Sequence, residues 1–576
     1  MNCDLKYFQL LCYFDKRDIL VNMKTSICDY LDHLNNETIV RFPPLRFLLK
    51  LDVMDLCDAF PELGDIIHNE PIKFNNICNE IYFACLKSTE NVYTQTIQAS
   101  QVAVTIRLKS LPRVLSRSTS QSRCGNVVTH FGLLLNISKL TSNVFHSVWS
   151  CPEECDGNEL ILHYIPKASP KCSLCKSTMF ENSGLRRCGE QVIATFKLKN
   201  TLLCKRFTII DDLIPLLQLG STYFIHTVVL KQTVAVWSLE EHIMLHVPPT
   251  FSAPSDIKDL FEACDGCPLR FIYCLASSIG VNVCPINCFM NAKINLLLSL
   301  SSLKAHLCTG SAIIHFLAAG SDTGYVAELM RRAALLADRH TSLGLSNTVV
   351  ETALIASSGG VCVMPFPLKV YNQKQINTLI SSIETGDINL EVGKCKLKCA
   401  VWAQGMDLKK NTLCNIGSVF GLISRGDNQE DEDDLADFTF QAAMEPAKTT
   451  KEELQALKDL SNYIDLVAGY TVIVTEETEN VLRNYFLAAR KEKPKTVSVK
   501  CMEALVAVCM TSARLCRRNA TNINDAVFAI WLHVSGLPSP RFAPEEYLET
   551  PANIKKFDKV IKLFVGWLEE FTGPIY

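Results

Sequence analysis

The chain has 576 residues, which is too long for a single hydrophobic core and predicts roughly three or four domains. Hydrophobic residues make up 48% of it, so it can bury several cores and is not a generally disordered protein. Its formal net charge of -3 gives no overall attraction to nucleic acid. Any nucleic-acid binding must therefore depend on a local basic patch.

The 26 cysteines have to be interpreted together with the compartment in which the protein folds. The first residues carry charges every few positions, without the apolar run of a signal peptide, and no stretch reaches the roughly 18 uncharged apolar residues of a membrane span. We therefore expect no membrane association and a reducing, intracellular location, where clustered cysteines are metal ligands and the others are small buried hydrophobes. The alternative is a secreted protein with disulfide bonds.

The first 250 residues predict two parts. Residues 1–115 combine helical periodicity with one strand, since apolar residues alternate from Val102 to Leu108. Residues 116–250 begin with a Ser/Arg-rich linker and continue as short strands, a pattern typical of a small barrel, with a cysteine-bearing insert at about 151–175.

The rest of the chain predicts a different architecture. A linker at 251–265 precedes residues 266–426, in which continuous apolar strands alternate with helices, as in an α/β domain with a parallel sheet. An acidic stretch at 427–449 is interpreted as a solvated linker. Residues 450–576 are predicted to be helical throughout, so the fold class is multidomain α/β plus all-β.

Two cysteine pairs give the strongest chemical signal. The spacing is Cys151-x3-Cys155 followed by Cys172-x2-Cys175, and two such pairs can converge as four thiolates around a tetrahedral Zn²⁺. A site closed by four sulfurs leaves no position for water, so its zinc would be structural. His163 and Cys188 lie near enough in sequence to replace a ligand. The alternative is that these cysteines are unligated.

A second signal comes from what is missing. The run SAIIHFLAAGSDTGYVAELM has the layout of a phosphate-binding loop, with a buried strand, a glycine, a polar turn and a helix. Counted from Gly320, the positions of the phosphate-binding lysine and the magnesium-binding hydroxyl hold Val326 and Ala327. The last glycine is replaced by Tyr325, whose bulk would obstruct phosphate. Taken alone, the run is more typical of an ordinary strand-helix turn, because strand-glycine-helix units occur in many α/β folds.

The sequence that follows resembles the minichromosome maintenance (MCM) family of replicative helicases. TALIASSGGVCVMPF is followed by the helical QINTLISSIETG, the hairpin-like DINLEVGKCKLK and the strand CAVWAQG, in the order that the family shows. LDVMDLCDAFPELGDIIHNEP is similar to the family's N-terminal subdomain, and MEALVAVCMTSARL with NINDAVFAIWL is similar to its C-terminal lid. The resemblance covers nearly the whole chain and implies a helical N-terminal subdomain, an oligonucleotide-binding (OB) barrel with a zinc insert, and an AAA+ module with a helical lid.

The departures from the family are concentrated in its catalytic residues. Met364 and Pro365 stand where the resemblance places the acidic pair that holds magnesium and activates water. Val419 replaces the arginine that is donated to a neighbouring subunit, and Ala507 replaces the arginine of the lid. Phosphoryl transfer depends on such charges, so the resemblance implies a pseudo-ATPase, and the losses weaken the case for ATP binding as well.

A degenerate ATPase on this plan is similar to the meiotic members of the MCM family. That similarity implies a nuclear, chromosome-associated scaffold in meiotic recombination and double-strand break repair, with other MCM-like subunits or recombination proteins as partners. Two alternatives remain open: a silent subunit of a helicase hetero-oligomer, and a protein adaptor that never touches DNA. The candidate DNA contacts are Lys394, Lys396 and Lys398, whose alternate spacing places them on one face of a strand. The alternative is that these lysines belong to a solvated edge strand, which they protect from aggregation.

Overall fold

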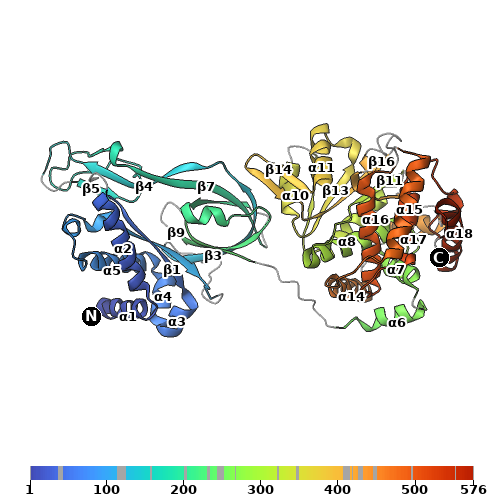
Figure 1. Cartoon of the computed structure of the whole chain (residues 1–576), viewed down its shortest axis with the longest axis horizontal. Helices are drawn as coiled ribbons and strands as arrows, with labels where there is room; N and C mark the ends of the chain where they lie inside the picture. The colour runs from blue at the N-terminus through green and yellow to red at the C-terminus, as the bar shows by residue number, and fades with distance from the viewer. Residues whose placement is uncertain are drawn as a thin grey trace. The chain divides into compact units, whose positions relative to one another are not determined.

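The structure is a computed structural model of the whole chain. The residues that it describes are 2–36, 43–112, 125–155, 159–199, 204–229, 234–242, 252–265, 267–320, 323–345, 349–406, 416–417, 419–425, 432–444, 451–494, 497–551 and 553–574. They form two compact units, Met1–Ile243 and Met244–Tyr576, which are described separately (Figure 1). No helix among the described residues is long and apolar enough to cross a membrane.

The first unit begins with a helical part built around a two-stranded parallel sheet. The predicted strand is confirmed as β2 (Val102–Lys109), which pairs along its whole length with β1 (Leu45–Asp52). Asp52 ends β1 and caps the next helix, because its side chain accepts hydrogen bonds from the first free backbone N–H groups. The helices are α1 (Asn2–Lys16), α2 (Ile19–Asn36), α3 (Val53–Ala59), α4 (Pro61–Asn69), α5 (Pro71–Lys87), η1 (Val92–Gln95) and η2 (Ala99–Gln101).

The remainder of this unit is an antiparallel sheet of eight strands within the described residues. The strand order is β10-β9-β3-β7-β4-β5, with β8 paired to β7 and β6 paired to β4. Buried residues from several strands, such as Phe196, Phe207 and Tyr223, form its core. The strands are β3 (Val127–Ile137), β4 (Thr141–Ser150), β5 (Glu159–Leu162), β6 (Phe180–Glu181), β7 (Arg187–Leu198), β8 (Cys204–Ile210), β9 (Thr222–Val229) and β10 (Val234–Glu241), with η5 (Ser183–Leu185) and η6 (Asp211–Leu216) between them.

The second unit contains the predicted parallel sheet. Its described strands are ordered β12-β13-β16-β11-β17, which is 2-3-4-1-5 when they are numbered along the chain, and every pairing is parallel. The strands are β11 (Phe316–Gly320), β12 (His340–Ser342), β13 (Val361–Pro367), β16 (Ala400–Met406) and β17 (Ile423–Arg425). The accompanying elements are α6 (Ser255–Ala263), α7 (Pro268–Ser277), α8 (Met290–Thr309), α9 (Thr323–Ala334), α10 (Val350–Ala356), η7 (Leu368–Val370), α11 (Gln373–Thr385) and the hairpin β14 (Asp387–Leu390) and β15 (Gly393–Lys396).

The core of this unit lies between the sheet and α8. Almost every residue of α8 is buried, including its serines, so their hydroxyl groups need internal partners. Ser299 shows how this need is met, because its hydroxyl donates to the Ile314 carbonyl (2.6 Å) and accepts from the indole N–H of the buried Trp402 (2.8 Å). These bonds fix α8 against β16 and against the segment that leads into β11.

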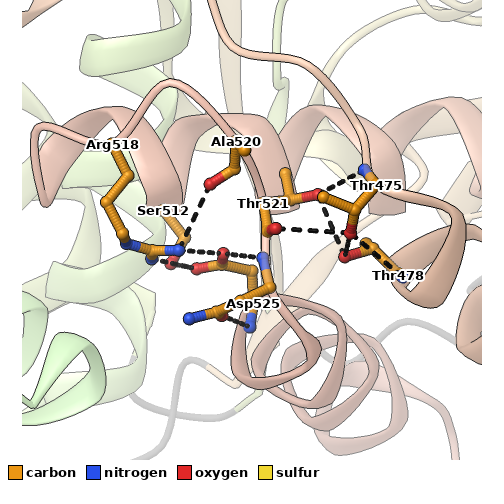
Figure 2. A network of polar contacts seen from close by, with 8 residues as sticks. Thr475, Thr478, Ser512, Arg518, Ala520, Thr521 and Asp525 are labelled. Atoms are coloured by element: carbon orange, nitrogen blue, oxygen red, sulfur yellow. Dashed lines mark hydrogen bonds and ion pairs between the residues drawn. The ribbon is translucent and has the colours of Figure 1, made fainter.

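The end of the chain is helical, as predicted. The helices are α14 (Lys451–Ala468), α15 (Glu476–Glu492), α16 (Val499–Leu515), α17 (Ile523–Gly536) and α18 (Ile554–Thr572), with η8 (Glu545–Tyr547) before the last. A polar network holds three of them together around Asp525, which is fully buried (Figure 2). Its carboxylate accepts two 2.8 Å hydrogen bonds from Arg518 and one of 2.6 Å from Ser512. Thr475, Thr478 and Thr521 form the adjoining hydroxyl cluster that joins α15.

Two predicted linkers differ from the structure. The acidic stretch contains a helix, α13 (Glu432–Met444). Its acidic residues lie in the first turns, where their negative charges stabilise the helix by interacting with the positive end of its dipole. Leu435 packs on the core of the unit and gives this helix a buried side that the charge pattern did not reveal. Residues 427–431 and 445–449 of the predicted linker lie outside the described residues. The predicted linker at 251–265 contains α6, which is anchored by the buried Ile257.

Candidate functional site

The four predicted zinc ligands come from two tight turns at one end of β4. Cys151 directly follows β4, and its turn returns through Cys155 towards β5, which pairs with β4. Cys172 and Cys175 lie in a second turn, closed by hydrogen bonds from the Cys172 N–H to the Ser177 carbonyl (2.9 Å) and from the Met179 N–H to the Pro170 carbonyl (2.9 Å). The chain then enters β6, which also pairs with β4. Pairing on the same strand is what brings the two turns together.

The four sulfur atoms converge, as the spacing predicted. All lie within 4.8 Å of one another, with Cys151 Sγ 3.3 Å from Cys175 Sγ and 3.8 Å from Cys155 Sγ. The backbone N–H of Cys175 also donates to Cys172 Sγ (3.3 Å). Four sulfurs at these separations can surround one metal ion.

Both turns contain a residue in the left-handed backbone region that favours glycine. These residues are Glu154, at φ 47°, and Lys176, at φ 60°. Glu154 directly precedes Cys155, and Lys176 directly follows Cys175. The turns therefore adopt this conformation at the points where the cysteine side chains point inward. Hydrogen bonds from Ser177 lower the pKa of the Cys175 thiol to about 6, whereas burial raises the pKa of Cys151. Deprotonation is the change that metal binding requires.

The two predicted substitute ligands do not join this cluster. Within the described residues, the metal-competent group comprises only the four cysteines. His163 instead lies beside His146, with ring centroids 6.1 Å apart, and Cys188 is exposed on β7 opposite Val144. The small apolar cluster around the sulfurs is formed by Trp149 and Met179. Because this apolar cluster is small, the cysteines are the main link between the two turns.

The predicted phosphate loop lies between β11 and α9, and the residues described at its two key positions, Val326 and Ala327, are buried and apolar. Gly320 ends β11 at φ 153°, and residues 321 and 322 lie outside the described residues. Val326 is fully buried and belongs to the inward stripe of α9, together with Leu329 and Met330, while Ala327 is 4% exposed. A side chain at position 326 therefore points into the core of the unit rather than to a ligand.

The other positions of the predicted degenerate site are also apolar. Met364 is fully buried in the middle of β13, and the carbonyl of Pro365 accepts a hydrogen bond from Gln404 Nε2 (2.5 Å). Since β11, β13 and β16 are parallel neighbours, their carboxyl ends meet at the edge of the sheet where ligands bind in such folds. Ala507 is buried in α16. Val419 is half-buried just before β17, and its neighbour at position 418 lies outside the described residues.

Two aromatic side chains meet beside this turn, and only one of them was noted in the sequence. Tyr325, in the first turn of α9, stacks on Phe289, which directly precedes α8. The Tyr325 hydroxyl also lies 3.1 Å from the hydroxyl of Thr439 in α13. The expected bulk at position 325 is present, but its partners are 36 and 114 residues away, and no local pattern links them.

The predicted basic row lies on the hairpin formed by β14 and β15. Lys394, Lys396 and Lys398 are exposed, whereas the residues between them are less exposed, so the three share one face as predicted. The row is partly neutralised, because Lys396 Nζ lies 2.8 Å from a carboxylate oxygen of Asp387 on the paired strand. Lys394 and Lys398 are therefore the positions with charge to offer a ligand.

Known proteins share sequence with this chain at both the domain and the whole-chain level. Residues 6–111 match the family described as "MCMDC2, N-terminal domain". The chain is also 20% identical over 596 aligned residues to the minichromosome maintenance domain-containing protein 2 of Rattus norvegicus, with 86% of each chain covered. The chain is similar to the MCMDC2 proteins over most of its length. The predicted resemblance to the MCM family is thereby confirmed, and the mixed arrangement of helices, antiparallel sheet and parallel sheet is consistent with an MCM-like multidomain plan.

Proposed function

We propose that this MCMDC2-like chain is a non-catalytic scaffold in meiotic recombination and double-strand break repair, acting in the nucleus on chromosomes. The observation that carries the proposal is the replacement of charge by buried apolar side chains at Val326 and Met364 on an intact parallel sheet. Neither residue can stabilise the anionic transition state of phosphoryl transfer or hold magnesium. The meiotic assignment is supported by kinship with the MCMDC2 group.

The proposed architecture is a zinc-stapled OB barrel followed by a pseudo-ATPase module of the AAA+ type. The first part is supported by the antiparallel eight-stranded sheet with its four converging cysteines, a donor set that suits structural Zn²⁺. The second part is supported by the 2-3-4-1-5 order of the parallel sheet and by the helices that follow it. Without hydrolysis, such a protein acts by joining other MCM-like subunits or recombination proteins.

ATP turnover and zinc content of the purified chain, alone and with candidate partners, test this function. We expect no turnover in either preparation, and about one zinc per chain. Turnover that is present in the parent and abolished by Val326→Asp would overturn the proposal, because it would place a working site at this turn. Turnover that appears only with an MCM-like partner would favour a silent helicase subunit.

Contact with DNA is a separate element of the proposal and has its own measurement. Affinity for single-stranded DNA should fall by about one log unit per log unit of salt for each phosphate that a lysine neutralises. The hairpin lysines Lys394, Lys396 and Lys398 are the proposed contacts. Binding without a salt dependence, or no binding, would favour a protein adaptor that acts without DNA.

A further inference from the structure

Three elements that surround the degenerate turn are joined by one aromatic side chain. The ring of Tyr325, in the first turn of α9, stacks on Phe289 with centroids 5.5 Å apart and planes inclined by 28°. Its hydroxyl reaches Thr439 on α13 at 3.1 Å. One side chain thus connects α9 with the start of α8 and with the helix that follows the last strand of the sheet.

The α8 side of this contact is held in a fixed position. Phe289 is 4% exposed and adopts the left-handed conformation, at φ 54° and ψ 34°, which is uncommon for a residue with a bulky side chain. The segment before it is held by the buried Lys293, whose ammonium group donates to the carbonyls of Pro285 (2.9 Å) and Ile286 (3.0 Å). Phe289 is therefore presented to Tyr325 by a constrained backbone rather than by a free rotamer.

The α13 side has a defined hydrogen-bond direction. The Thr439 hydroxyl donates its one proton to the Leu435 carbonyl at 2.7 Å, so the Tyr325 hydroxyl must donate to the Thr439 oxygen. A second contact, from Asn287 Nδ2 to a carboxylate oxygen of Asp434 (3.4 Å), joins α13 to the segment before Phe289. Leu435 packs on the same core as Tyr325. Most of α13 is otherwise exposed, so these contacts are a large part of what positions it.

We propose that Tyr325 is an internal ligand that occupies an aromatic-binding position beside Phe289 and holds α13 against α9 and the start of α8. A ligand bound at the carboxyl end of a parallel sheet contacts both the first turn of the following helix and the elements around it. Here the chain supplies that link itself, as a ring for stacking and a hydroxyl for hydrogen bonding. The position of α13 is then permanent and needs no small molecule. This inference rests on the pseudo-ATPase proposed above.

Hydrogen exchange of residues 432–444 tests the proposal in the full-length protein. Tyr325→Ala should speed exchange in α13 by at least about tenfold, because it removes both the stack and the hydrogen bond. Tyr325→Phe and Thr439→Val keep the stack and lose only the hydrogen bond, so each should give an increase of about two- to tenfold. Tyr164→Ala, which removes a tyrosine that is 58% exposed in the other unit, is the matched control and should leave α13 unchanged.

Chemical rescue separates an internal ligand from ordinary core packing. Tyr325→Ala leaves a space with the shape of the lost ring, and p-cresol, which has that ring and hydroxyl, should restore slow exchange in α13. Toluene, which lacks the hydroxyl, should restore only the level of Tyr325→Phe. Unchanged exchange in α13 of Tyr325→Ala would overturn the proposal. Equal acceleration in α13 and in the buried α17 would also overturn it, because the residue would then be a general core position.

Failure of this inference and failure of the proposed function give different results. ATP turnover by the parent protein would contradict the pseudo-ATPase and with it the premise that no nucleotide is needed, whatever the exchange data show. Exchange that is unaffected by Tyr325→Ala, in a parent without turnover, would remove the internal ligand and leave the pseudo-ATPase in place.

Discussion

The cysteine cluster and the strand-helix turn are both sites at which the sequence suggests chemistry, and the structure treats them in opposite ways. At the cluster, four polarisable sulfur atoms converge within 4.8 Å, and two strained backbone positions point them inward. At the turn, the positions that would carry charge are occupied by Val326 and Met364, both fully buried. The first site brings four candidate metal ligands together, whereas the second has buried apolar side chains at the positions where charge was expected in the family.

The difference shows which parts of a site a fold can do without. A parallel sheet with its helices is stabilised by buried apolar area, so the buried side chains of Val326 and Met364 add to the core. Within the part of the chain that the structure describes, the core of the cysteine turns consists of Trp149, Met179, the cysteines themselves and a few partly buried neighbours. Removing their metal ligands takes away the main stabilising interaction. Removal of the cysteines should therefore destabilise the first region, and introduction of a charged side chain should destabilise the second.

The largest effect is expected from removal of the cysteines. Cys172→Ser combined with Cys175→Ser should lower the zinc content from about one per chain to near zero and unfold both turns, because structural zinc supplies much of the folding free energy of small metal modules. Metal analysis and limited proteolysis between residues 151 and 181 measure this. Cys188→Ser is the control, since Cys188 is exposed and outside the cluster. Full zinc content in the double variant would show that the four sulfurs are not the ligands.

The next largest effect should come from the polar network of the helical end, where charge has been kept. Asp525→Ala leaves the Arg518 guanidinium and the Ser512 hydroxyl without their shared acceptor in a buried site (Figure 2). Breaking a buried pair on one side costs about 3 kcal/mol. Urea unfolding followed by the fluorescence of Trp531, which is buried in α17, measures the loss.

The matching control for this network is Glu570→Gln, an exposed carboxylate on α18 that should change stability by less than about 0.5 kcal/mol. An Asp525→Ala protein as stable as the control would mean that the network contributes nothing to the helical end. The Asp525 carboxylate would then add no measurable stability to the helical end.

Restoring the missing lysine should be destabilising rather than activating. Val326→Lys places an ammonium group on the inward stripe of α9, where the native side chain is fully buried, and a buried unpaired charge should cost about 3 kcal/mol or more. Thermal unfolding and ATP turnover are measured together, with Val326→Ala as the size control. Undiminished stability, or measurable turnover, would show that the turn has kept room for a phosphate-binding side chain.

The sequence was most informative where the interaction is local. Alternation from Val102 to Leu108 predicted β2, and the spacing of the four cysteines predicted the cluster, because each pair closes a turn of its own. The succession of apolar strands and helices predicted a parallel sheet. In these cases a period of two, or a spacing of a few residues, carries the physical constraint directly.

The sequence was least informative where the interaction is tertiary. The acidic run predicted a solvated linker, yet Leu435 gives α13 a buried side, and a single apolar residue among carboxylates is too weak a pattern to predict a helix. His163 was interpreted as a spare ligand from its position in the chain, but the pairing of β4 with β5 and β6 turns it away from the cysteines. The contact between Phe289 and Tyr325 depends on how three helices pack, and no periodicity encodes it.

The smallest effect is expected at the hairpin of β14 and β15, where one of the three candidate lysines is already paired with a carboxylate. Lys394→Ala combined with Lys398→Ala should reduce the salt dependence of single-stranded DNA binding by about two, one for each phosphate that is no longer neutralised. Lys396→Ala should have a smaller effect, because its ammonium group is already 2.8 Å from Asp387. Fluorescence anisotropy across a salt series gives the slopes. Equal reductions in Lys394→Ala, Lys396→Ala and Lys398→Ala, each made singly, would mean that the ion pair between Lys396 and Asp387 opens when DNA binds. An unchanged slope in the double variant would place the DNA-binding residues on another surface.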